Sequence, residues 1–256
     1  MTTALITGAS AGLGREFARQ LAAGGKDLVL VARRRGPMAA LAQELREAHG
    51  VDVEIVTADL SEAAAPVMLE RAMRDKGLEI DYLINNAGAE GPDLIRERDW
   101  AKHDAYLRLM MTSVAAMCHE FVPAMLERGF GRVLNVASVA GQLTLNGDYS
   151  YGPTKAYLIA LSKAMNASFR SSGVYVTALC PGFTHTDFHD SAKLTAMKRG
   201  PPKFIWYDAD VVVREGLAAL EKGKEEYISG RLYRFLIPIL RMRLTRGLIS
   251  IFGVRL

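Results

Sequence analysis

Cysteine is scarce in this chain of 256 residues, in which Cys118 and Cys180 are the only two. So few cysteines exclude a small secreted scaffold held together by disulfides. No apolar run reaches the roughly 18 to 20 residues that cross a bilayer, because Arg interrupts even the most apolar stretch near the C-terminus. Residues 2–6 carry no positively charged leader of a signal peptide. We therefore expect a reducing, cytoplasmic setting.

The composition is that of a folded domain. Hydrophobic residues make up 50% of the chain and charged residues 23%, which excludes global disorder and allows one large core. We find no internal repeat, low-complexity block or interdomain linker. The sequence therefore predicts one domain over residues 1–230 and a distinct segment over 231–256.

The formal net charge of +4 comes from the C-terminal segment. Residues 231–256 contain six Arg and no Lys, Asp or Glu, so the rest of the chain holds 26 basic residues against 28 acidic ones. Positive charge confined to one terminal segment does not form the basic face that nucleic acid requires, and no nucleic-acid partner is expected.

The same segment is apolar as well as basic, with 15 apolar residues among its 26. This composition suits peripheral contact with a membrane, where Arg side chains meet anionic headgroups. A helix packed across the domain's own substrate lid, or an oligomer contact, fits the composition equally well. Pro238 and Gly247 are expected to break the segment into pieces.

Short β-rich apolar runs alternate with longer helical patterns along the domain. This alternation is typical of βαβ units, and the near-continuous apolar runs indicate strands covered on both faces. The fold class predicted is α/β, a single-domain Rossmann-type doubly wound parallel sheet with helices on both faces. The expected strands are 4–7, 28–32, 53–57, 82–85, 133–137, 174–179 and 226–229, and the expected helices are 14–23, 38–49, 66–75, 101–128, 151–171 and 209–222.

The long helix expected at 101–128 carries a stripe of Met, Cys and other apolar residues at helical spacing. Its members are Val114, Met117, Cys118, Phe121, Val122 and Met125. We interpret the stripe as core or as the interface of a homo-oligomer, rather than as a cofactor site.

A glycine-rich turn follows the first expected strand and precedes a helical pattern. Glycines there let the backbone approach a pyrophosphate, while the N–H groups and the dipole of the next helix hold its charge. The residues predicted to bind are Gly8, Ser10, Ala11, Gly12, Leu13 and Gly14, in the order Thr-Gly-x-x-x-Gly-x-Gly.

With the motifs that follow it in order, this turn resembles the short-chain dehydrogenase/reductase family over residues 3 to about 230. Those motifs are Asp59-Leu60, Asn85-Asn86-Ala87-Gly88, Ser138, Tyr151-x-x-x-Lys155 and Pro181-Gly182. The resemblance implies an oxidoreductase that transfers hydride between a nicotinamide nucleotide and a carbonyl or alcohol group. It also implies that Asn86, Ala87, Gly88, Pro181 and Gly182 contact the nucleotide.

Three consecutive Arg after the second strand decide the expected nucleotide. NAD-preferring members of the family usually have an acid there, whereas this chain has Arg33, Arg34 and Arg35, and its first acid is the distant Glu44. A guanidinium of Arg33 or Arg34 can pair with a 2′-phosphate, so NADP(H) is favoured over NAD(H). Arg35 is interpreted as a solvated residue at the start of a helix.

Asp59 and Leu60 are expected at the adenine end, with the Asp59 carboxylate on the adenine amino group and Leu60 beside the ring. A helix cap is the structural alternative in this region. We assign that cap to Ser61, which precedes Glu62.

Tyr151 and Lys155 stand four positions apart on a helical pattern, so both side chains emerge on one face. An ammonium there is expected to lower the phenol's pKa and make Tyr151 the general acid or base. The family resemblance implies that Lys155 also holds the nicotinamide ribose and that Ser138 donates to the substrate oxygen. An ordinary turn or cap is the alternative for Ser138. Tyr149 lacks a Lys four residues on and is assigned to the rim.

One position departs from the family pattern. The family usually has an Asn in the long helix before the fifth strand, where it helps hold a water that leads to the catalytic Lys. Counting back from Pro123, that position is Met110, and a thioether cannot replace a carboxamide in ordering water. Either Thr112 or Ser113 helps from another turn, or the proton relay runs differently.

The residues after Pro181-Gly182 are expected on the substrate side. By family analogy the Thr184 backbone meets the nicotinamide carboxamide and the Thr186 hydroxyl reaches a phosphate or that carboxamide. His185, Asp187 and His189 lack an evident fourth ligand, so no metal is predicted. A lid over about 183–206 is rich in large apolar residues, and the expected substrate contacts are Ser138, Leu143, Tyr149, Phe183 and Phe188.

These observations predict an NADP(H)-dependent carbonyl reductase or alcohol dehydrogenase that acts on a small hydrophobic molecule. The rival is a nucleotide-binding regulator or scaffold of the same fold with little or no catalysis. Intact Ser138, Tyr151 and Lys155 argue against that rival, and Met110 argues for it.

Overall fold

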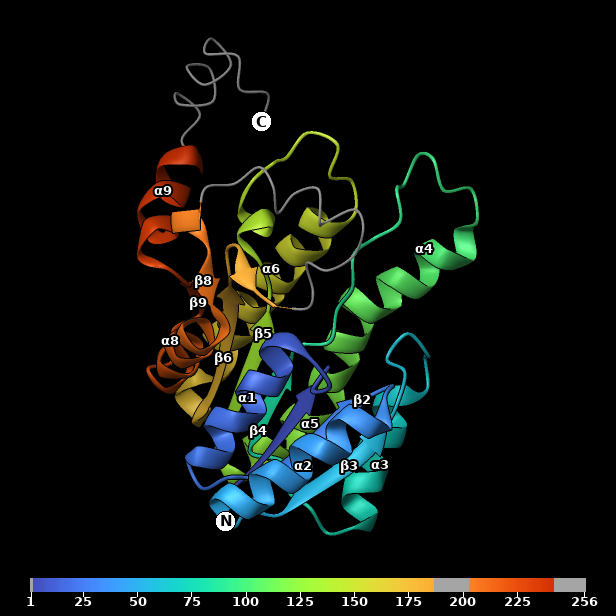
Figure 1. Ribbon diagram of the computed structural model, residues 1–256, viewed down its shortest axis with the longest axis vertical. Helices are drawn as coiled ribbons and strands as arrows, with labels where there is room; N and C mark the ends of the chain where they lie inside the picture. The colour runs from blue at the N-terminus through green and yellow to red at the C-terminus, as the bar shows by residue number, and fades with distance from the viewer. Residues whose placement is uncertain (1, 187–202, 242–256) are drawn as a thin grey trace.

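A seven-stranded sheet forms the centre of the molecule in a computed structural model that describes residues 2–186 and 203–241 (Figure 1). All its strand pairs are parallel and their order is β3-β2-β1-β4-β5-β6-β9. This confirms the doubly wound Rossmann-type fold, with its topological switch between β1 and β4. The strands are β1 Thr3–Thr7, β2 Asp27–Ala32, β3 Val53–Thr57, β4 Tyr82–Asn85, β5 Gly131–Val136, β6 Val174–Cys180 and β9 Glu226–Ile228.

Helices cover both faces of the sheet. One face packs on α1 Gly12–Ala23, α2 Arg35–His49 and α8 Ala209–Glu221, and the other on α3 Ala65–Asp75, α5 Ser113–Arg128 and α6 Tyr151–Phe169. Leu5 and Ile6 of β1 are fully buried in opposite core clusters, because successive side chains of a strand point to opposite faces. Short 3-10 turns occupy η2 Val139–Gln142, η3 Arg170–Ser172 and η5 Lys203–Ile205.

The long helix predicted at 101–128 is present, with a local widening. α4 Trp100–Leu107 passes through a π-helical turn, η1 Arg108–Thr112, into α5. By length and hydropathy, Trp100–Arg128 is a candidate membrane span. Its predicted apolar stripe nevertheless packs in the core, where Met117, Cys118 and Phe121 are buried. The interpretation of the stripe as core is therefore confirmed.

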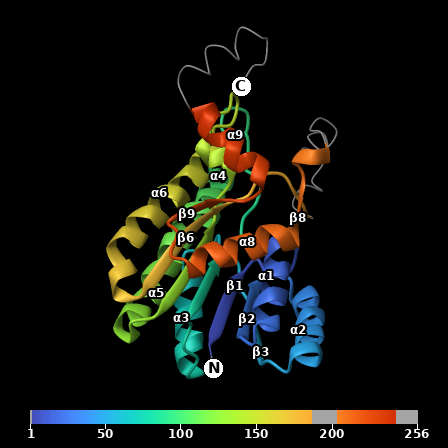
Figure 2. The same ribbon diagram turned by 90° about the vertical axis from the view of Figure 1, so that its left-hand side faces the viewer.

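The first part of the C-terminal segment is one helix, α9 Arg231–Arg241, which lies above α8 near the carboxyl ends of the strands (Figure 2). The prediction that Pro238 breaks this segment is wrong, because Pro238 lies inside the helix. Proline removes one N–H donor, but Tyr233 and Ile237, 8% and 2% exposed, pack the helix onto the domain on the turn before it. Gly247 lies outside the described residues.

Candidate active site

The glycine turn sits between β1 and α1 and leaves no room for side chains. Gly12 and Gly14 form the first turn of α1. A Cβ added at Gly14 would lie 2.2 Å from the Gly8 carbonyl oxygen and 2.6 Å from Asn86 Nδ2. Only glycine fits this approach. No side chain caps the N-terminus of α1, where the sequence predicts an anion site.

Thr7 joins the end of β1 to the end of β4. Its hydroxyl accepts hydrogen bonds from the N–H groups of Asn86 and Ala87 at 2.9 and 3.0 Å, and Asn86 Nδ2 donates to the Thr7 carbonyl at 2.9 Å. These bonds hold residues 86–88 beside the glycine turn across the switch point of the sheet. Sequence reasoning did not assign Thr7 to the site.

Basic side chains surround Ser10 at the far end of the turn. Arg34 Nη2 donates to Ser10 Oγ at 3.3 Å, and Arg15 Nη2 donates to the Ser10 carbonyl at the same distance. Arg33 Nη1 lies 3.8 Å from Asp59 Oδ2. The structure thus brings the predicted Arg33, Arg34 and Ser10 to one end of the crevice, together with Arg15, which the sequence analysis missed.

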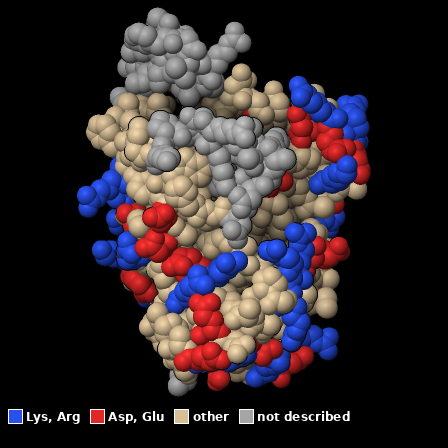
Figure 3. Space-filling view, viewed as in Figure 1, with Lys and Arg blue, Asp and Glu red and all other residues tan. Residues whose placement is uncertain are grey.

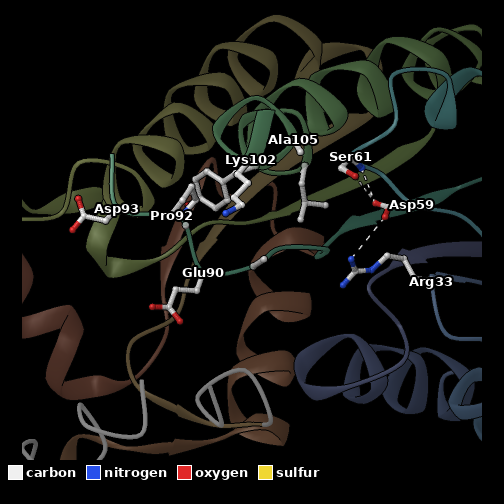
Figure 4. A pocket seen from close by; sticks show the side chains of 12 residues that line it. Arg33, Asp59, Ser61, Glu90, Pro92, Asp93, Lys102 and Ala105 are labelled. Atoms are coloured by element: carbon white, nitrogen blue, oxygen red, sulfur yellow. Dashed lines mark hydrogen bonds and ion pairs between the residues drawn. The ribbon is translucent and has the colours of Figure 1, made fainter. Parts of the chain in front are cut away.

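A cavity of about 540 Å³ opens next to this end of the crevice. Figure 4 shows Arg33, Asp59 and Ser61 on one side of it and Glu90 and Lys102 on the other. It is the candidate site for the adenosine end of a nucleotide. Leu60, predicted beside the adenine ring, is 5% exposed and packs in the core cluster under α3.

The helix cap expected at Ser61 is absent. α3 begins at Ala65 without a side-chain cap, and Asp59 Oδ1 instead accepts from Ser61 N and Oγ at 3.0 and 2.8 Å. Burial alone would raise the Asp59 pKa, but the bonds from Ser61 and the nearby Arg33 guanidinium leave it lowered. Ser61 therefore orients the Asp59 carboxylate at the cavity wall.

Tyr151 is fixed by the start of α6. The Asp148 carboxylate accepts from the N–H groups of Tyr151 and Gly152 at 2.9 and 2.8 Å, so it caps the first turn of the helix. This cap aims the predicted proton donor, and an Asp three residues before the expected helix was the signal that could have revealed it.

Ser138, Tyr151 and Lys155 converge at the carboxyl end of β5. Ser138 is hydrogen-bonded to the Tyr151 phenol and also accepts from Ala140 N at 3.1 Å, so it caps η2 as well. Lys155 Nζ lies 5.6 Å from the centre of the Tyr151 ring and donates to the Val136 carbonyl at 2.7 Å. Both the catalytic and the capping interpretations of Ser138 fit these contacts.

The titration of the pair differs from the expectation. Burial raises the pKa of Tyr151 to about 12 against the opposing effect of the Ser138 hydrogen bond, whereas the sequence analysis expected Lys155 to lower it. Burial also lowers the pKa of Lys155 to about 8. Desolvation of the phenol dominates its pKa, while the Lys155 ammonium donates to the Val136 carbonyl. At neutral pH Tyr151 therefore holds its proton.

Met110 lies in the π-helical turn, 1% exposed. Its sulfur accepts from Ala89 N at 3.3 Å and would lie 3.3 Å from a Cβ at Gly88. Neither proposed substitute for an Asn is suited to the task. Thr112 is exposed, and the Ser113 hydroxyl donates to the Leu109 carbonyl at 2.8 Å within its own helix.

The turn after β6 carries the remaining predicted contacts. Thr184 is 3% exposed, and its hydroxyl donates to the Gly182 carbonyl at 3.0 Å. Thr186 Cβ would lie 3.3 Å from a Cβ at Gly12, so Thr186 lies beside the glycine turn. Phe183 packs against Trp206 in a tilted arrangement with ring centres 5.1 Å apart.

The other predicted substrate residues are partly accounted for. Leu143 is half-buried just after η2, and Tyr149 is 55% exposed at the rim. Phe188, Asp187 and His189 lie outside the described residues. His185 stacks on Trp206, and no metal-binding cluster of His, Cys, Asp and Glu occurs among residues 2–186 and 203–241.

A buried chain of polar side chains ties together the elements that carry the site. Asn85 of β4 donates to Asn135 of β5 at 2.9 Å, and Asn135 donates to Ser162 of α6 at 2.9 Å. The Ser162 hydroxyl continues to the Leu158 carbonyl at 2.7 Å. This chain holds the helix of Tyr151 in register with the two central strands.

Comparison with known proteins agrees with this geometry. The sequence model of the short chain dehydrogenase family matches residues 2–196. The chain belongs to this family. It is therefore an oxidoreductase that uses a nicotinamide nucleotide and acts on alcohol or carbonyl groups, which argues against the purely regulatory rival.

Relatives of this short-chain dehydrogenase are enzymes of the same kind. It is 33% identical over 210 residues to an uncharacterised oxidoreductase of Myxococcus xanthus, covering 82% of this chain and 80% of that one. A short-chain dehydrogenase from Sphingobium yanoikuyae in complex with NADPH is 31% identical, with a TM-score of 0.80 over 98% and 96% of the two chains. A bulky-bulky ketone specific alcohol dehydrogenase from Comamonas testosteroni is 27% identical, with a TM-score of 0.77 over 98% and 94%.

Proposed function

We propose that this short-chain dehydrogenase uses NADP(H) to interconvert a bulky hydrophobic ketone and its secondary alcohol. The observation that carries the proposal is the convergence of Ser138, Tyr151 and Lys155 at the end of β5, on the same sheet edge as a glycine turn flanked by Arg34. A proton donor thus stands next to a site for a phosphorylated nucleotide.

The residues present fit a dinucleotide. The cradle at Gly14, which any Cβ would fill, and the N-terminus of α1 suit a pyrophosphate. Arg34, Arg33 and Ser10 suit a 2′-phosphate. When bound, the nicotinamide ring supplies or accepts the hydride.

No acid competes for the adenosine ribose after β2. The nearest one along the chain, Glu44, forms two hydrogen bonds to Arg19 of α1 at 2.8 and 3.1 Å. The Glu44 carboxylate is thus paired with Arg19 of α1. This arrangement supports NADP(H) over NAD(H).

Tyr151 supplies the proton in the direction of reduction. Its phenol, with a pKa of about 12, carries a proton that can pass to the developing alkoxide while the Ser138 hydroxyl donates to the same oxygen. The Lys155 ammonium near the ring then stabilises the phenolate that remains. In alcohol oxidation the same proton moves back to Tyr151.

The described part of the substrate side is apolar. The rings of Phe183 and Trp206 pack together, and Leu143 and Tyr149 lie in the loop after Ser138. The bulky ketones named for the Comamonas testosteroni relative are consistent with such walls. We therefore infer a carbonyl group between two large apolar substituents.

The nucleotide preference is tested by titrating the purified protein with NADPH and NADH. We expect NADPH to bind at least tenfold more tightly, as for one bidentate phosphate contact. In Arg33→Ala with Arg34→Ala that difference disappears, whereas Arg35→Ala leaves it unchanged. Equal affinities in the unsubstituted protein would contradict NADP(H) preference without affecting the assignment of Tyr151.

We also propose that α9 contacts a lipid surface with its outer side. Phe235 is 67% exposed and Leu236 36%, and Figure 3 shows few charged side chains over α9. The absence of acids from residues 231–256 favours anionic headgroups. The homo-oligomer and the cytoplasmic setting stay predictions.

A further inference from the structure

The phenol of Tyr233 bridges two segments of the substrate side. Its oxygen accepts from Phe183 N at 3.1 Å and donates to the Ile205 carbonyl at 2.9 Å. Phe183 follows β6, whereas Ile205 ends η5 more than twenty residues later. One side chain of the C-terminal helix therefore fixes the backbone on both sides of residues 187–202.

The ring of Tyr233 also fits against Gly182. A Cβ added at Gly182 would lie 2.0 to 2.5 Å from three carbon atoms of that ring. Residue 182 therefore has to be glycine as long as Tyr233 keeps its position. The family motif Pro181-Gly182 is thus shaped in this chain by a residue about fifty positions away.

Tyr207 completes the connection. Its N–H donates to the Phe183 carbonyl at 3.0 Å, and its phenol accepts from Leu232 N at 3.2 Å. β7 Thr184–His185 and β8 Tyr207–Asp208 pair as a short parallel ladder beside these contacts. Both backbone polar groups of Phe183 are consequently held, one by Tyr233 and one by Tyr207.

We propose that Tyr233 is a positioning residue, which sets the turn at residues 181–183 and thereby the place of the Phe183 side chain against the carbonyl substrate. The proposal rests on the proposed function in one respect, namely that Phe183 contacts the substrate. Without the phenol, the Phe183 N–H and the Ile205 carbonyl lose their partner, and the turn relaxes to find another. The working site then extends beyond the family motifs to α9.

Tyr227 offers a matched control. Its phenol accepts from Arg234 Nη1 at 2.7 Å, so it too ties α9 to the domain. It lies on β9, whereas the hydrogen bonds to Phe183 and Ile205 are made by the Tyr233 phenol. Tyr227→Phe and Tyr233→Phe each remove one hydroxyl that attaches α9 to the domain. Only Tyr233→Phe also removes the hydrogen bond to Phe183 in the turn.

The fluorescence of Trp206 can report on the turn at residues 181–183 in the absence of nucleotide and substrate. The Trp206 ring stacks on His185 and packs at a tilt against Phe183, with ring centres 5.1 Å apart in both pairs. Trp100→Phe leaves Trp206 as the single tryptophan. In that background we expect Tyr233→Phe to shift the tryptophan emission and Tyr227→Phe to leave it in place.

Steady-state kinetics give the second readout. In Tyr233→Phe we expect the KM for a bulky ketone to rise about tenfold, as when one to two hydrogen bonds are lost, with kcat changed by less than about threefold. NADPH affinity, measured by titration, should change less than the KM, because the glycine turn and Arg34 are untouched although Gly182 is also expected at the nucleotide. Tyr227→Phe should change none of these constants.

The outcomes separate the two proposals. Equal effects of the two variants on emission and on KM would show a merely structural role and overturn the positioning of the turn. If no ketone is reduced by any variant, the proposed function fails, while the emission shift still tests the role of Tyr233. Should Tyr233→Phe not fold, amide exchange at Phe183 in the unsubstituted protein decides: slow exchange supports the bond to the phenol, and exchange at the rate of an open loop contradicts it.

Discussion

The nucleotide side and the substrate side of this site are held in different ways. At the glycine turn, the tightest approach to Gly14 comes from the main chain, because a Cβ there would lie 2.2 Å from the Gly8 carbonyl oxygen. At the turn after β6, the phenol of Tyr233, from the distant helix α9, accepts from the Phe183 N–H and its ring lies against Gly182. The closest contact of the first turn is therefore made by the main chain, and that of the second by a side chain that a single substitution removes.

This difference explains how one fold keeps its nucleotide while its substrate changes. Contacts made by main chain atoms leave no side chain to vary, so the turn accepts few substitutions. Contacts made by phenol groups can be exchanged or moved without disturbing the sheet. We expect the two sides to respond differently to the same kind of change.

The largest effect is expected at the proton donor that both sides share. Tyr151→Phe removes the acidic hydrogen and should lower kcat by about 10²- to 10⁴-fold while NADPH affinity is kept. Tyr157→Phe makes the same chemical change further along α6 and is the control. Turnover in Tyr151→Phe equal to that of the control would remove Tyr151 from the mechanism.

Two alanine substitutions test the comparison itself. Gly14→Ala should weaken NADPH binding about a hundredfold because its Cβ meets the Gly8 carbonyl oxygen at 2.2 Å, a backbone clash that no side-chain change relieves. Gly182→Ala should lower kcat/KM for the ketone about thirtyfold through its clash with Tyr233.

The three closest atoms in the second clash all belong to one side chain, that of Tyr233, whereas the closest in the first is the Gly8 carbonyl oxygen. Adding Tyr233→Ala should make Gly182→Ala harmless, so that the double variant is no worse than Tyr233→Ala alone. Kinetics and thermal melting of the four proteins of this cycle give the measurement. Additive losses in the double variant would show that the Tyr233 side chain does not cause the clash at Gly182, and would contradict the difference between the two sides.

A smaller effect is expected on the outer side of α9. Phe235→Asp should reduce binding to anionic vesicles about tenfold in co-sedimentation, because one large exposed apolar group is lost and a negative charge is added. Met68→Asp is the matched control, since Met68 is 66% exposed on α3, away from α9. Equal binding by both variants would exclude α9 as the contact.

The smallest effect concerns stability and pH. Burial lowers the Lys155 pKa to about 8, so below that pH the folded protein carries the full cost of a buried ammonium. That cost declines as pH rises from 8 toward the ordinary value of 10.5. Lys155→Met should therefore raise Tm at pH 7 by roughly 2–6 °C, and calorimetry should show the gain shrinking above pH 8. A gain that grows with pH would contradict this.

Short-range patterns in the sequence predicted most of the nucleotide side. The glycine turn needs only a strand, a spacing and a helix, and Tyr151 and Lys155 need only four positions on a helix. The alternation of apolar runs with helical patterns also predicted the parallel sheet, because strands buried on both faces have nearly unbroken apolar sequences.

Contacts between residues far apart in sequence could not be predicted in the same way. Tyr233 meets Gly182 only after α9 has folded onto the domain. The prediction that Pro238 breaks the segment was wrong because the packing of Ile237 outweighs one missing hydrogen bond. The raised pKa of Tyr151 also depends on burial, which four-residue spacing does not reveal. The cap assigned to Ser61 failed because α3 starts four residues later.

The most direct test of the whole account is hydride transfer by the purified protein. The loss of near-ultraviolet absorbance of NADPH would be followed with a ketone that bears two large apolar substituents, and compared with NADH and with acetone. We expect the absorbance to fall rapidly with NADPH and the bulky ketone, more slowly with NADH, and little with acetone. A faster reaction with acetone, or with NADH at equal concentration, would contradict this expectation.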